Sequence, residues 1–276
     1  MIDDADVVGH YDKADLYSQI LAGLGQEGLI QPTPQDLSAV DEFHIGGVEA
    51  TRFVSEALAP PAAGRLLDIG CGIGGPARFI AAETGCDVTG IDLTKSFVET
   101  GNHLSRLVGL DGQVTLQTGN ALALPFAENE FDAAYMIHVG MNIAEKTRLI
   151  GEAARVIRPS GRFVIYDVMQ MQDRALTYPL PWAENETASA VSSPAVYLDA
   201  MKKAGLVFTP PQNKHDFALQ FFDRMAKKGA GKQPPALGLH LVMGVTTPQK
   251  IQNIHHQIKQ GILAPVIITA SHKLVS

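Results

Sequence analysis

A glycine-rich segment at residues 66–75, with the sequence LLDIGCGIGG, has the residue types needed to hold a ligand against the main chain. Glycine allows tight turns and a close approach of the backbone to a ligand. The helix expected at 76–84 would begin directly after it, and the N-terminus of a helix attracts anionic groups. Gly70, Gly72 and Gly75 also fit the dinucleotide pattern G-x-G-x-x-G, so the segment on its own allows a nicotinamide cofactor.

Two acidic residues help to choose between the ligands. Asp92 follows the strand expected at 87–91, and a carboxylate at the end of this strand binds a ribose diol in either case. Asp68 lies just before the first glycine, where its negative charge would repel a pyrophosphate. It suits the ammonium group of S-adenosylmethionine, which carries no phosphate. The two acids therefore favour S-adenosylmethionine over NAD, and over a glycine turn that binds nothing.

The elements that must position these side chains alternate along the chain. We expect strands at 65–69, 87–91, 113–117, 131–137, 162–168, 206–209 and 262–269. We expect helices at 76–84, 94–108, 144–157, 194–204, 216–228 and 248–260. This alternation predicts a doubly wound, mostly parallel, seven-stranded α/β sheet with helices on both faces. Ligands bind such a sheet at the carboxyl ends of its strands, where Asp68 and Asp92 lie.

Two details of this pattern mark boundaries of the helices. Thr94 is the expected N-cap of the helix at 94–108. Pro159, Ser160 and Gly161 are expected to close the preceding helix before the fifth strand begins.

The chain divides into four regions on the same grounds. Residues 1–63 are expected to form a helical N-terminal lid, and 64–170 an α/β core that binds the cofactor. Residues 171–247 have a looser pattern and are interpreted as a substrate cap interleaved with the sixth strand of the core. Residues 248–276 supply the closing helix and the last strand.

Residues 64–168 resemble the class I S-adenosylmethionine-dependent methyltransferases, which have a Rossmann-like fold. The resemblance lies in LLDIGCG at 66–72, GIDL at 90–93, GNALALPF at 119–126, FD at 131–132 and RVIRPSGR at 155–162. The wider chain is similar to small-molecule members such as the sarcosine and dimethylglycine N-methyltransferases, through DEFHIGG at 41–47 and the region of Trp182. The resemblance implies transfer of a methyl group from S-adenosylmethionine to a small-molecule acceptor by in-line displacement.

The resemblance also implies which residues contact the cofactor. They are Asp68, Gly70, Cys71, Gly72, Asp92, Leu93, Asn120, Ala121 and His138. Asp68 would hold the methionyl ammonium, Asp92 both ribose hydroxyls, and Leu93 would pack on the adenine. Family members usually carry Asp where this chain has Asn120. Its side-chain carbonyl still accepts a hydrogen bond from the adenine amino group, so we expect binding to survive.

His138 follows the fourth strand and is the candidate catalytic residue. An amine acceptor has to be deprotonated, and a histidine with a pKa near its usual 6.5 is able to act as the base. The alternative is a histidine that only bonds a backbone carbonyl. Further candidates for the acceptor site or lid are Tyr11, His44, Met141, Asn142, Trp182 and His240. For each of these a structural role is the alternative: core packing, or a helix cap in the case of Asn142.

Four functions remain open at this point. The first is a methyltransferase acting on a small amine, and the second is one acting on carbon or oxygen of a phenol, lipid or sterol. An amino-acid acceptor would need an arginine for its carboxylate, and Arg52, Arg174 and Arg224 lie outside the core. The third is a cofactor-binding protein without catalysis, and the fourth an NAD oxidoreductase.

Composition excludes several classes of partner. The net charge of -7 and pI of about 5.7 argue against a nucleic-acid-binding surface. No apolar run approaches the roughly 20 residues that span a membrane, and the acidic N-terminus does not resemble a signal peptide. Cys71 and Cys86 fit neither a metal site nor a disulfide framework. We therefore expect a cytoplasmic monomer or homodimer with a small-molecule acceptor and no metal.

Overall fold

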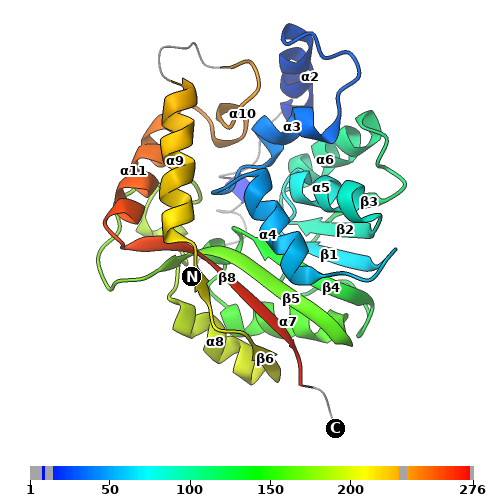
Figure 1. Ribbon diagram of the computed structural model, residues 1–276, viewed down its shortest axis with the longest axis vertical. Helices are drawn as coiled ribbons and strands as arrows, with labels where there is room; N and C mark the ends of the chain where they lie inside the picture. The colour runs from blue at the N-terminus through cyan, green and yellow to red at the C-terminus, as the bar shows by residue number, and fades with distance from the viewer. Residues whose placement is uncertain (1–7, 10–14, 230–234, 274–276) are drawn as a thin grey trace.

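The computed structural model describes residues 8–9, 15–229 and 235–273, and a β-sheet runs through its centre (Figure 1). The strands are β1 Arg65–Ile69, β2 Asp87–Asp92, β3 Val114–Thr118, β4 Phe131–Ile137, β5 Ile157–Gln170, β6 Leu206–Phe208, β7 Gln212–Asn213 and β8 Leu263–His272. Their order is β3-β2-β1-β4-β5-β8-β6, and β7 pairs with β8 beside this path. β1 to β5 run parallel, whereas β8 is antiparallel to β5, β6 and β7. The predicted mostly parallel α/β sheet is confirmed, with the short β7 added to the expected strands.

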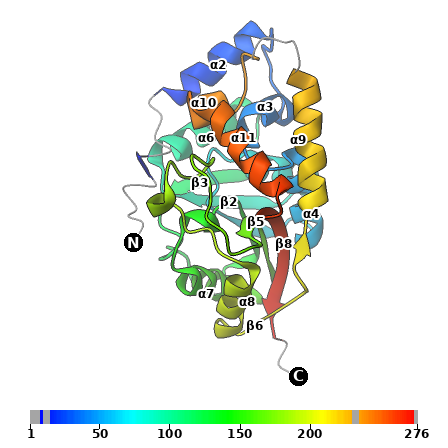
Figure 2. The same ribbon diagram turned by 90° about the vertical axis from the view of Figure 1, so that its left-hand side faces the viewer.

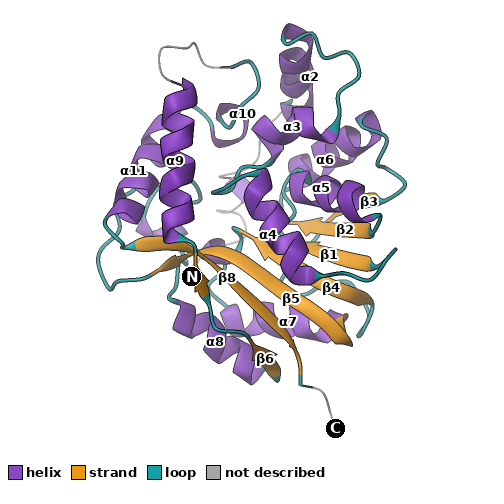
Figure 3. Ribbon diagram, in the orientation of Figure 1, coloured by secondary structure: helices purple, strands orange, loops and turns teal. Residues whose placement is uncertain are grey.

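Helices cover both faces of the sheet. They are α2 Leu16–Gln26, α3 Pro34–Asp41, α4 Val48–Leu58, α5 Gly75–Thr84, α6 Lys95–Leu107, α7 Lys146–Val156, α8 Pro194–Lys203, α9 His215–Gly229, α10 His240–Met243 and α11 Thr247–Lys259. Figure 3 shows α4, α5 and α6 on one side of the sheet and α7 and α8 on the other. Each side has its own apolar core, so the central strands are buried on both faces and are almost continuously apolar.

The start of β5 differs from the sequence-based expectation. Ile157 already pairs with Phe131, and pairing resumes at Arg162 opposite Ala133. Residues 159–161 lie in β5 where its pairing with β4 is irregular. α7 ends at Val156, and β5 begins directly after it. The expected turn at 159–161 and the strand start at 162 were therefore wrong, because the pairing of this segment depends on β4, which a local pattern does not contain.

The remaining helices gather at one end of the molecule. In Figures 1 and 2, α2, α3, α9, α10 and α11 all lie in the upper half of the view. α2 packs against α6 and α10, α3 packs against α5, and α9 packs against α11. Two smaller apolar cores hold these helices together. None of the helices in the described ranges is long and apolar enough to cross a membrane.

Candidate active site

The glycine segment turns sharply at the end of β1. Gly70 has φ 76° and Gly72 has φ 52°, which are left-handed conformations that other residues rarely adopt. A Cβ atom at Gly70 would lie 2.3 Å from Cγ2 of Val139, and one at Gly72 would lie 2.9 Å from Cζ of Phe43. Conformation and space therefore both require glycine at these two positions. The turn forms one wall of a cavity at the carboxyl ends of the strands.

Asp92 lies at the end of β2 and faces this cavity. Its Oδ2 accepts a hydrogen bond from the Gly72 N–H at 2.9 Å, and its Oδ1 accepts one from the Thr94 N–H at 2.9 Å. Burial raises the pKa of Asp92, and the bonds from Thr94 and Gly72 oppose this shift. Thr94 is the N-cap residue of α6 as expected, but its side chain makes no capping bond. The carboxylate thus ties the glycine turn to the start of α6.

Asp68 lies on β1 beside the same cavity and is only 2% exposed. Its Oδ2 atom has no hydrogen-bond partner among the described residues. Burial raises the pKa of Asp68 to about 8; Tyr135 opposes the shift and Asp92 adds to it. A buried carboxylate without a partner is costly. A ligand ammonium group would supply both the missing donor and the compensating charge, which fits S-adenosylmethionine.

Residues at the ends of β2 and β3 line the part of the cavity next to Asp92. They are Ile91, Leu93, Thr94, Phe97, Gly119, Asn120, Ala121 and Leu122. The side chain of Asn120 accepts a bond from the Leu122 N–H at 2.7 Å, which fixes this turn. Phe97 on α6 was not predicted, although it belongs to the apolar face of an amphipathic helix that the sequence shows.

His138 follows β4 with φ 54°, a strained conformation for a residue other than glycine. Its N–H donates to the Tyr166 carbonyl at 2.8 Å, and its ring is stacked on Tyr166 with 5.4 Å between ring centroids. Its Nε2 atom is buried without a partner in the described part of the chain. Burial lowers the pKa of His138 well below its usual value, so the imidazole is uncharged at neutral pH.

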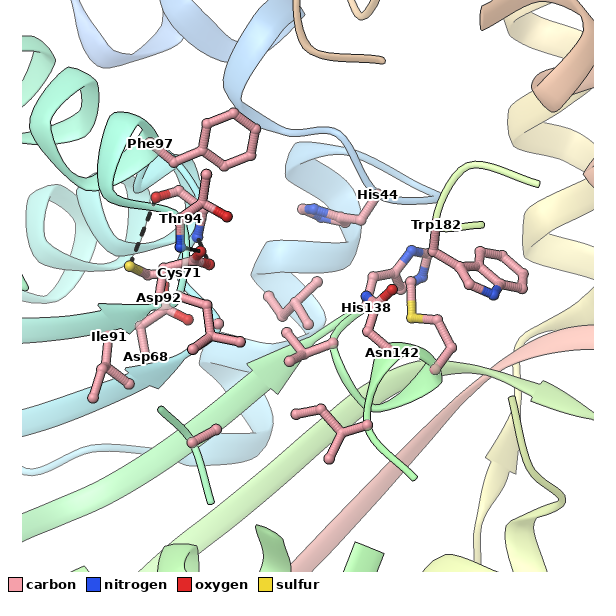
Figure 4. Close-up of a pocket in the computed structure, with 18 of the residues that line it drawn as sticks. His44, Asp68, Cys71, Ile91, Asp92, Thr94, Phe97, His138, Asn142 and Trp182 are labelled. Atoms are coloured by element: carbon pink, nitrogen blue, oxygen red, sulfur yellow. Dashed lines mark hydrogen bonds between the residues drawn. The ribbon is translucent and has the colours of Figure 1, made fainter. Parts of the chain in front are cut away.

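His44 lies in the loop between α3 and α4 and lines the cavity. In Figure 4 it lies near His138, between the Asp68 and Asp92 side of the cavity and Trp182. Its ring is 5.8 Å from that of His138, measured between centroids. Burial lowers the pKa of His44 to about 4, so it is also neutral. The Nε2 atom lies 3.3 Å from Oε2 of Glu42.

The other end of the cavity is apolar. Its lining residues are His44, Met141, Asn142, Ile143, Glu145, Pro181, Trp182 and Met243, and Phe43 lies between this end and the glycine turn, with its ring 6.1 Å from that of Phe97. The Trp182 indole N–H donates to Ser189 Oγ at 2.9 Å, which satisfies its only donor. Asn142 ends a short 3-10 helix, and Glu145 rather than Asn142 is the N-cap residue of α7. Asn142 therefore lines the cavity and is not the cap of this helix.

Comparisons with known proteins agree with this geometry. Residues 67–165 match the family model described as a methyltransferase domain. Over 204 residues the chain is 28% identical to methyltransferase GfsG of Streptomyces halstedii, covering 73% of this chain and 72% of that protein. Over 123 residues it is 38% identical to 24-methylenesterol C-methyltransferase 2 of Oryza sativa subsp. japonica, covering 43% of this chain and 34% of that protein.

The chain is a class I S-adenosylmethionine-dependent methyltransferase. The family and the cofactor predicted from the sequence are therefore confirmed. Only about a third of the rice sterol relative is matched, so its substrate is not transferred to this chain.

Solved structures show the same fold. The methyltransferase superposes on geranyl diphosphate C-methyltransferase of Streptomyces coelicolor with a TM-score of 0.71, over 98% of both chains at 18% identity. A putative sarcosine dimethylglycine methyltransferase from Galdieria sulphuraria gives a TM-score of 0.65 at 14% identity, over 95% of this chain and all of that one. At these identities the likeness shows the fold alone.

Most of the expected site residues of the methyltransferase lie around one cavity. The exceptions are Tyr11, which lies outside the described residues, and His240, which is on α10 but does not line the cavity. Met243, one helical turn further along α10, lines it instead. Cys71 does line the cavity and is buried, with Sγ directed to the Gly72 carbonyl (Figure 4).

Several lining residues were not predicted, among them Phe43, Ile143, Glu145, Pro181 and Met243. Phe43 lies in a segment noted only for its resemblance, and Met243 in an apolar stretch whose role was left open. The three arginines considered for a substrate carboxylate do not line the cavity; Arg224 pairs instead with Glu49 on α4. No cluster of metal-binding side chains occurs in residues 8–9, 15–229 and 235–273.

Proposed function

We propose that this methyltransferase acts on an oxygen or carbon atom of an uncharged, largely apolar small molecule. The observation that carries the proposal is the lining of the acceptor end, where aromatic, aliphatic and thioether side chains predominate. Among the described residues around the cavity there is no lysine or arginine. An anionic group pays a large penalty on leaving water unless a cation or several donors receive it. The cavity therefore disfavours acceptors with a carboxylate or phosphate group.

The residues next to the glycine turn would hold the cofactor. Asp68 would receive the ammonium group, and Asp92 the ribose hydroxyls in charge-assisted hydrogen bonds. Gly70, Cys71 and Gly72 would lie along the ligand because they leave it room. Leu93 and Ala121 would pack on the adenine and Asn120 would accept a bond from its amino group. His138 would contact both the cofactor and the acceptor.

S-adenosylmethionine supplies an electrophilic methyl group, so the protein mainly has to place the acceptor and exclude water. Positioning of two reactants is worth on the order of 7–11 kcal/mol. The charge of the reacting pair is dispersed as the methyl group moves, and apolar walls formed by Phe43, Met141 and Trp182 favour this change.

Two regions outside the core would complete the pocket. Phe43 and His44 come from the proposed lid at 1–63, and Trp182 and Met243 from the proposed cap at 171–247. The core at 64–170 and the closing elements at 248–276 would support them. Enclosure by both regions favours a small acceptor over a macromolecule, with the enzyme acting as a monomer or homodimer.

A small amine without an acidic group is the second candidate. Glu145 lines the cavity with an exposed carboxylate, whose Oε2 lies 3.9 Å from Nη1 of Arg148, a residue outside the lining. An alkylammonium group would be attracted there. Sarcosine and dimethylglycine themselves are not proposed as acceptors, because their carboxylates would face acidic and apolar residues.

Transfer of a radiolabelled methyl group tests the proposal. The acceptors are a set of uncharged phenols, terpenoid alcohols and sterols, a set of simple alkylamines, and sarcosine, dimethylglycine and geranyl diphosphate with Mg²⁺. We expect product with uncharged acceptors and none with the three anionic ones. Efficient methylation of any of the anionic acceptors would contradict the proposal, since their charge would have to be buried without a cation.

The pH dependence of cofactor binding tests the role of Asp68. The pKa of about 8 in the empty cavity means that the carboxyl group is mostly protonated at pH 7. Binding of an ammonium group requires the ionised form, so affinity should rise as pH increases and level off above pH 8. We expect about a tenfold gain per pH unit below that value for S-adenosylhomocysteine.

Titration calorimetry in buffers with different heats of ionisation would also detect the proton that Asp68 releases on binding. The Asp68→Asn variant is the control, because it has no proton to lose at this position. It should bind more weakly and show a flatter pH profile. Wild-type affinity that does not change between pH 6 and 8 would rule out this role.

A further inference from the structure

The loop between α3 and α4 contains a buried pair of titratable side chains beside the acceptor end of the cavity. Glu42 is 6% exposed and His44 is 8% exposed. Thr51 on α4 lies against both and is fully buried. The Thr51 hydroxyl donates to Glu42 Oε2 at 2.6 Å, and its oxygen lies 3.2 Å from Nε2 of His44.

The surroundings of His44 determine where its proton lies. Nε2 is 3.1 Å from the Gly47 carbonyl, 3.2 Å from Thr51 Oγ1 and 3.3 Å from Glu42 Oε2. The carbonyl only accepts, the ionised carboxylate only accepts, and the threonine hydrogen is already used toward Glu42. Neutral His44 therefore carries its hydrogen on Nε2. The lone pair on Nδ1, which has no hydrogen bond within the described residues, is free to accept a proton.

We propose that His44 is the base that takes the proton of the methyl acceptor, and that Glu42 and Thr51 position it. This inference rests on the proposed function, because only an acceptor with an O–H or acidic C–H group loses a proton during transfer. The acceptor hydrogen moves to Nδ1 as the new bond to the methyl group forms. The ionised Glu42 stabilises the charge of the resulting imidazolium beside the Nε2 hydrogen, which stays on His44. Nδ1 then releases the acceptor proton to water as the product leaves, which restores the Nε2–H form, so one proton leaves for each methyl group transferred.

His138 is less suited to this task. No carboxylate or carbonyl of the described residues bonds its Nε2 atom, which is buried, and its ring is held flat against Tyr166. A base whose other nitrogen is oriented by an acceptor is the arrangement found in catalytic triads. Of the two described histidines that line the cavity, only His44 has that arrangement. His138 would then contact and position the cofactor and the acceptor without taking a proton.

The charges around Glu42 predict the pH at which the pair becomes active. Burial and the neighbouring Asp41 raise the pKa of Glu42 to about 8; the Thr51 hydroxyl and Arg78 oppose this, and Asp68 adds to it. The other titratable groups near Glu42 are Tyr135 and the two uncharged histidines, His44 and His138. Glu42 stabilises the imidazolium of His44 only when it is ionised, so turnover should rise as the pH increases through about 8.

Turnover as a function of pH, with the uncharged acceptor that reacts fastest in the transfer assay, is the first test. We expect Glu42→Gln to remove the rise in rate near pH 8. We expect His44→Asn to lower turnover by about 100-fold, the scale of general base catalysis, without loss of affinity for S-adenosylhomocysteine. Thr51→Val should move the rise to higher pH. The hydrogen bond from Thr51 lowers the pKa of Glu42, so the loss of this bond raises that pKa. Glu56→Gln, an exposed position on α4, is the control and should behave as wild type.

The second test needs no acceptor. Nitrogen-15 NMR of labelled histidine in the protein loaded with S-adenosylhomocysteine, assigned with His44→Asn, reports which nitrogen carries the hydrogen. We expect the Nε2–H form at pH 9, where Glu42 is ionised. A hydrogen on Nδ1 would overturn the proposal, because that atom would then be unable to accept another.

The outcomes separate this inference from the function on which it rests. Wild-type transfer to an uncharged acceptor, with an unchanged rate in His44→Asn, would reject the role of His44 alone. Absence of transfer to every uncharged acceptor would reject the proposed function and the base together. Loss of turnover in His44→Asn accompanied by an equal loss of cofactor affinity would make His44 a binding residue, and would also overturn the proposal.

Discussion

The Asp92→Ala variant is expected to bind S-adenosylmethionine and S-adenosylhomocysteine about 100-fold more weakly than the wild type. In the proposed complex the carboxylate accepts two charge-assisted hydrogen bonds, each worth at least about 1.5 kcal/mol, and about 1.4 kcal/mol corresponds to a factor of ten. The substitution also leaves the Gly72 and Thr94 N–H groups without their acceptor, which loosens the glycine turn. Both effects act in the same direction.

Titration calorimetry with both ligands measures this loss. Asp87→Ala is the matched control, because Asp87 begins the same strand, is exposed and lies away from the cavity. It should bind both ligands as the wild type does. Asp92→Asn should fall between the two, since an amide oxygen still accepts a hydrogen bond but carries no charge. Unchanged affinity in Asp92→Ala would refute the ribose assignment.

The Arg78→Met variant is expected to lose about 3–5 kcal/mol of folding free energy, because it leaves a buried charge without its partner. Arg78 on α5 is 1% exposed, and its Nη2 donates to Asp41 Oδ2 and to the Ile73 carbonyl, both at 2.8 Å. Its Nη1 donates to the Gly101 carbonyl at 3.1 Å and to Ser105 Oγ at 3.2 Å. One side chain thus joins α3, the glycine turn and α6.

Denaturant unfolding of the single variants and of Asp41→Asn/Arg78→Met measures this effect. The double variant should be less destabilised than the sum of the two single ones, since neither charge is left alone. Burial already raises the pKa of Asp41, and Arg78 opposes the shift. Without Arg78 the cost of burying the ionised Asp41 is present above its unfolded pKa and shrinks as the pH falls toward it.

The exposed Arg106 on α6 is the control for a loss of positive charge, and Arg106→Met should change stability by less than about 0.5 kcal/mol. If Arg78→Met lost as little folding free energy as this, the attraction between Arg78 and Asp41 would only offset the cost of removing the two charges from water.

Local features of the site follow from the sequence because they depend on neighbours along the chain. Gly70 and Gly72 are needed where β1 turns into α5, and Asp92 ends the strand that pairs with β1. Alternating strands and helices require a parallel sheet, and a parallel sheet brings the ends of β1, β2 and β4 to one edge. The fold class and the cofactor were therefore predictable without coordinates.

Errors arose where a residue's environment is made by a distant segment. The β5 boundary depends on pairing with β4 rather than on the turn at 159–161. His240 and Met243 share one helix, and only the packing of α10 against α2 determines which of them faces the cavity. The residue types of this helix give no direction, because a helix of four residues is too short to define a face.

The sequence by itself determined the sheet, the glycine turn and a cofactor that carries an ammonium group rather than a pyrophosphate, because these follow from local conformation and from the position of Asp68. Only the tertiary structure decided which side chains line each end of the cavity, and the proposed acceptor end rests on that lining. The Glu42 and His44 pair, the Arg78 to Asp41 contact and the absence of a basic side chain among the described lining residues all depend on how α3, α5 and the cap pack. Packing is the sum of many weak contacts between distant segments, and no short stretch of sequence contains it.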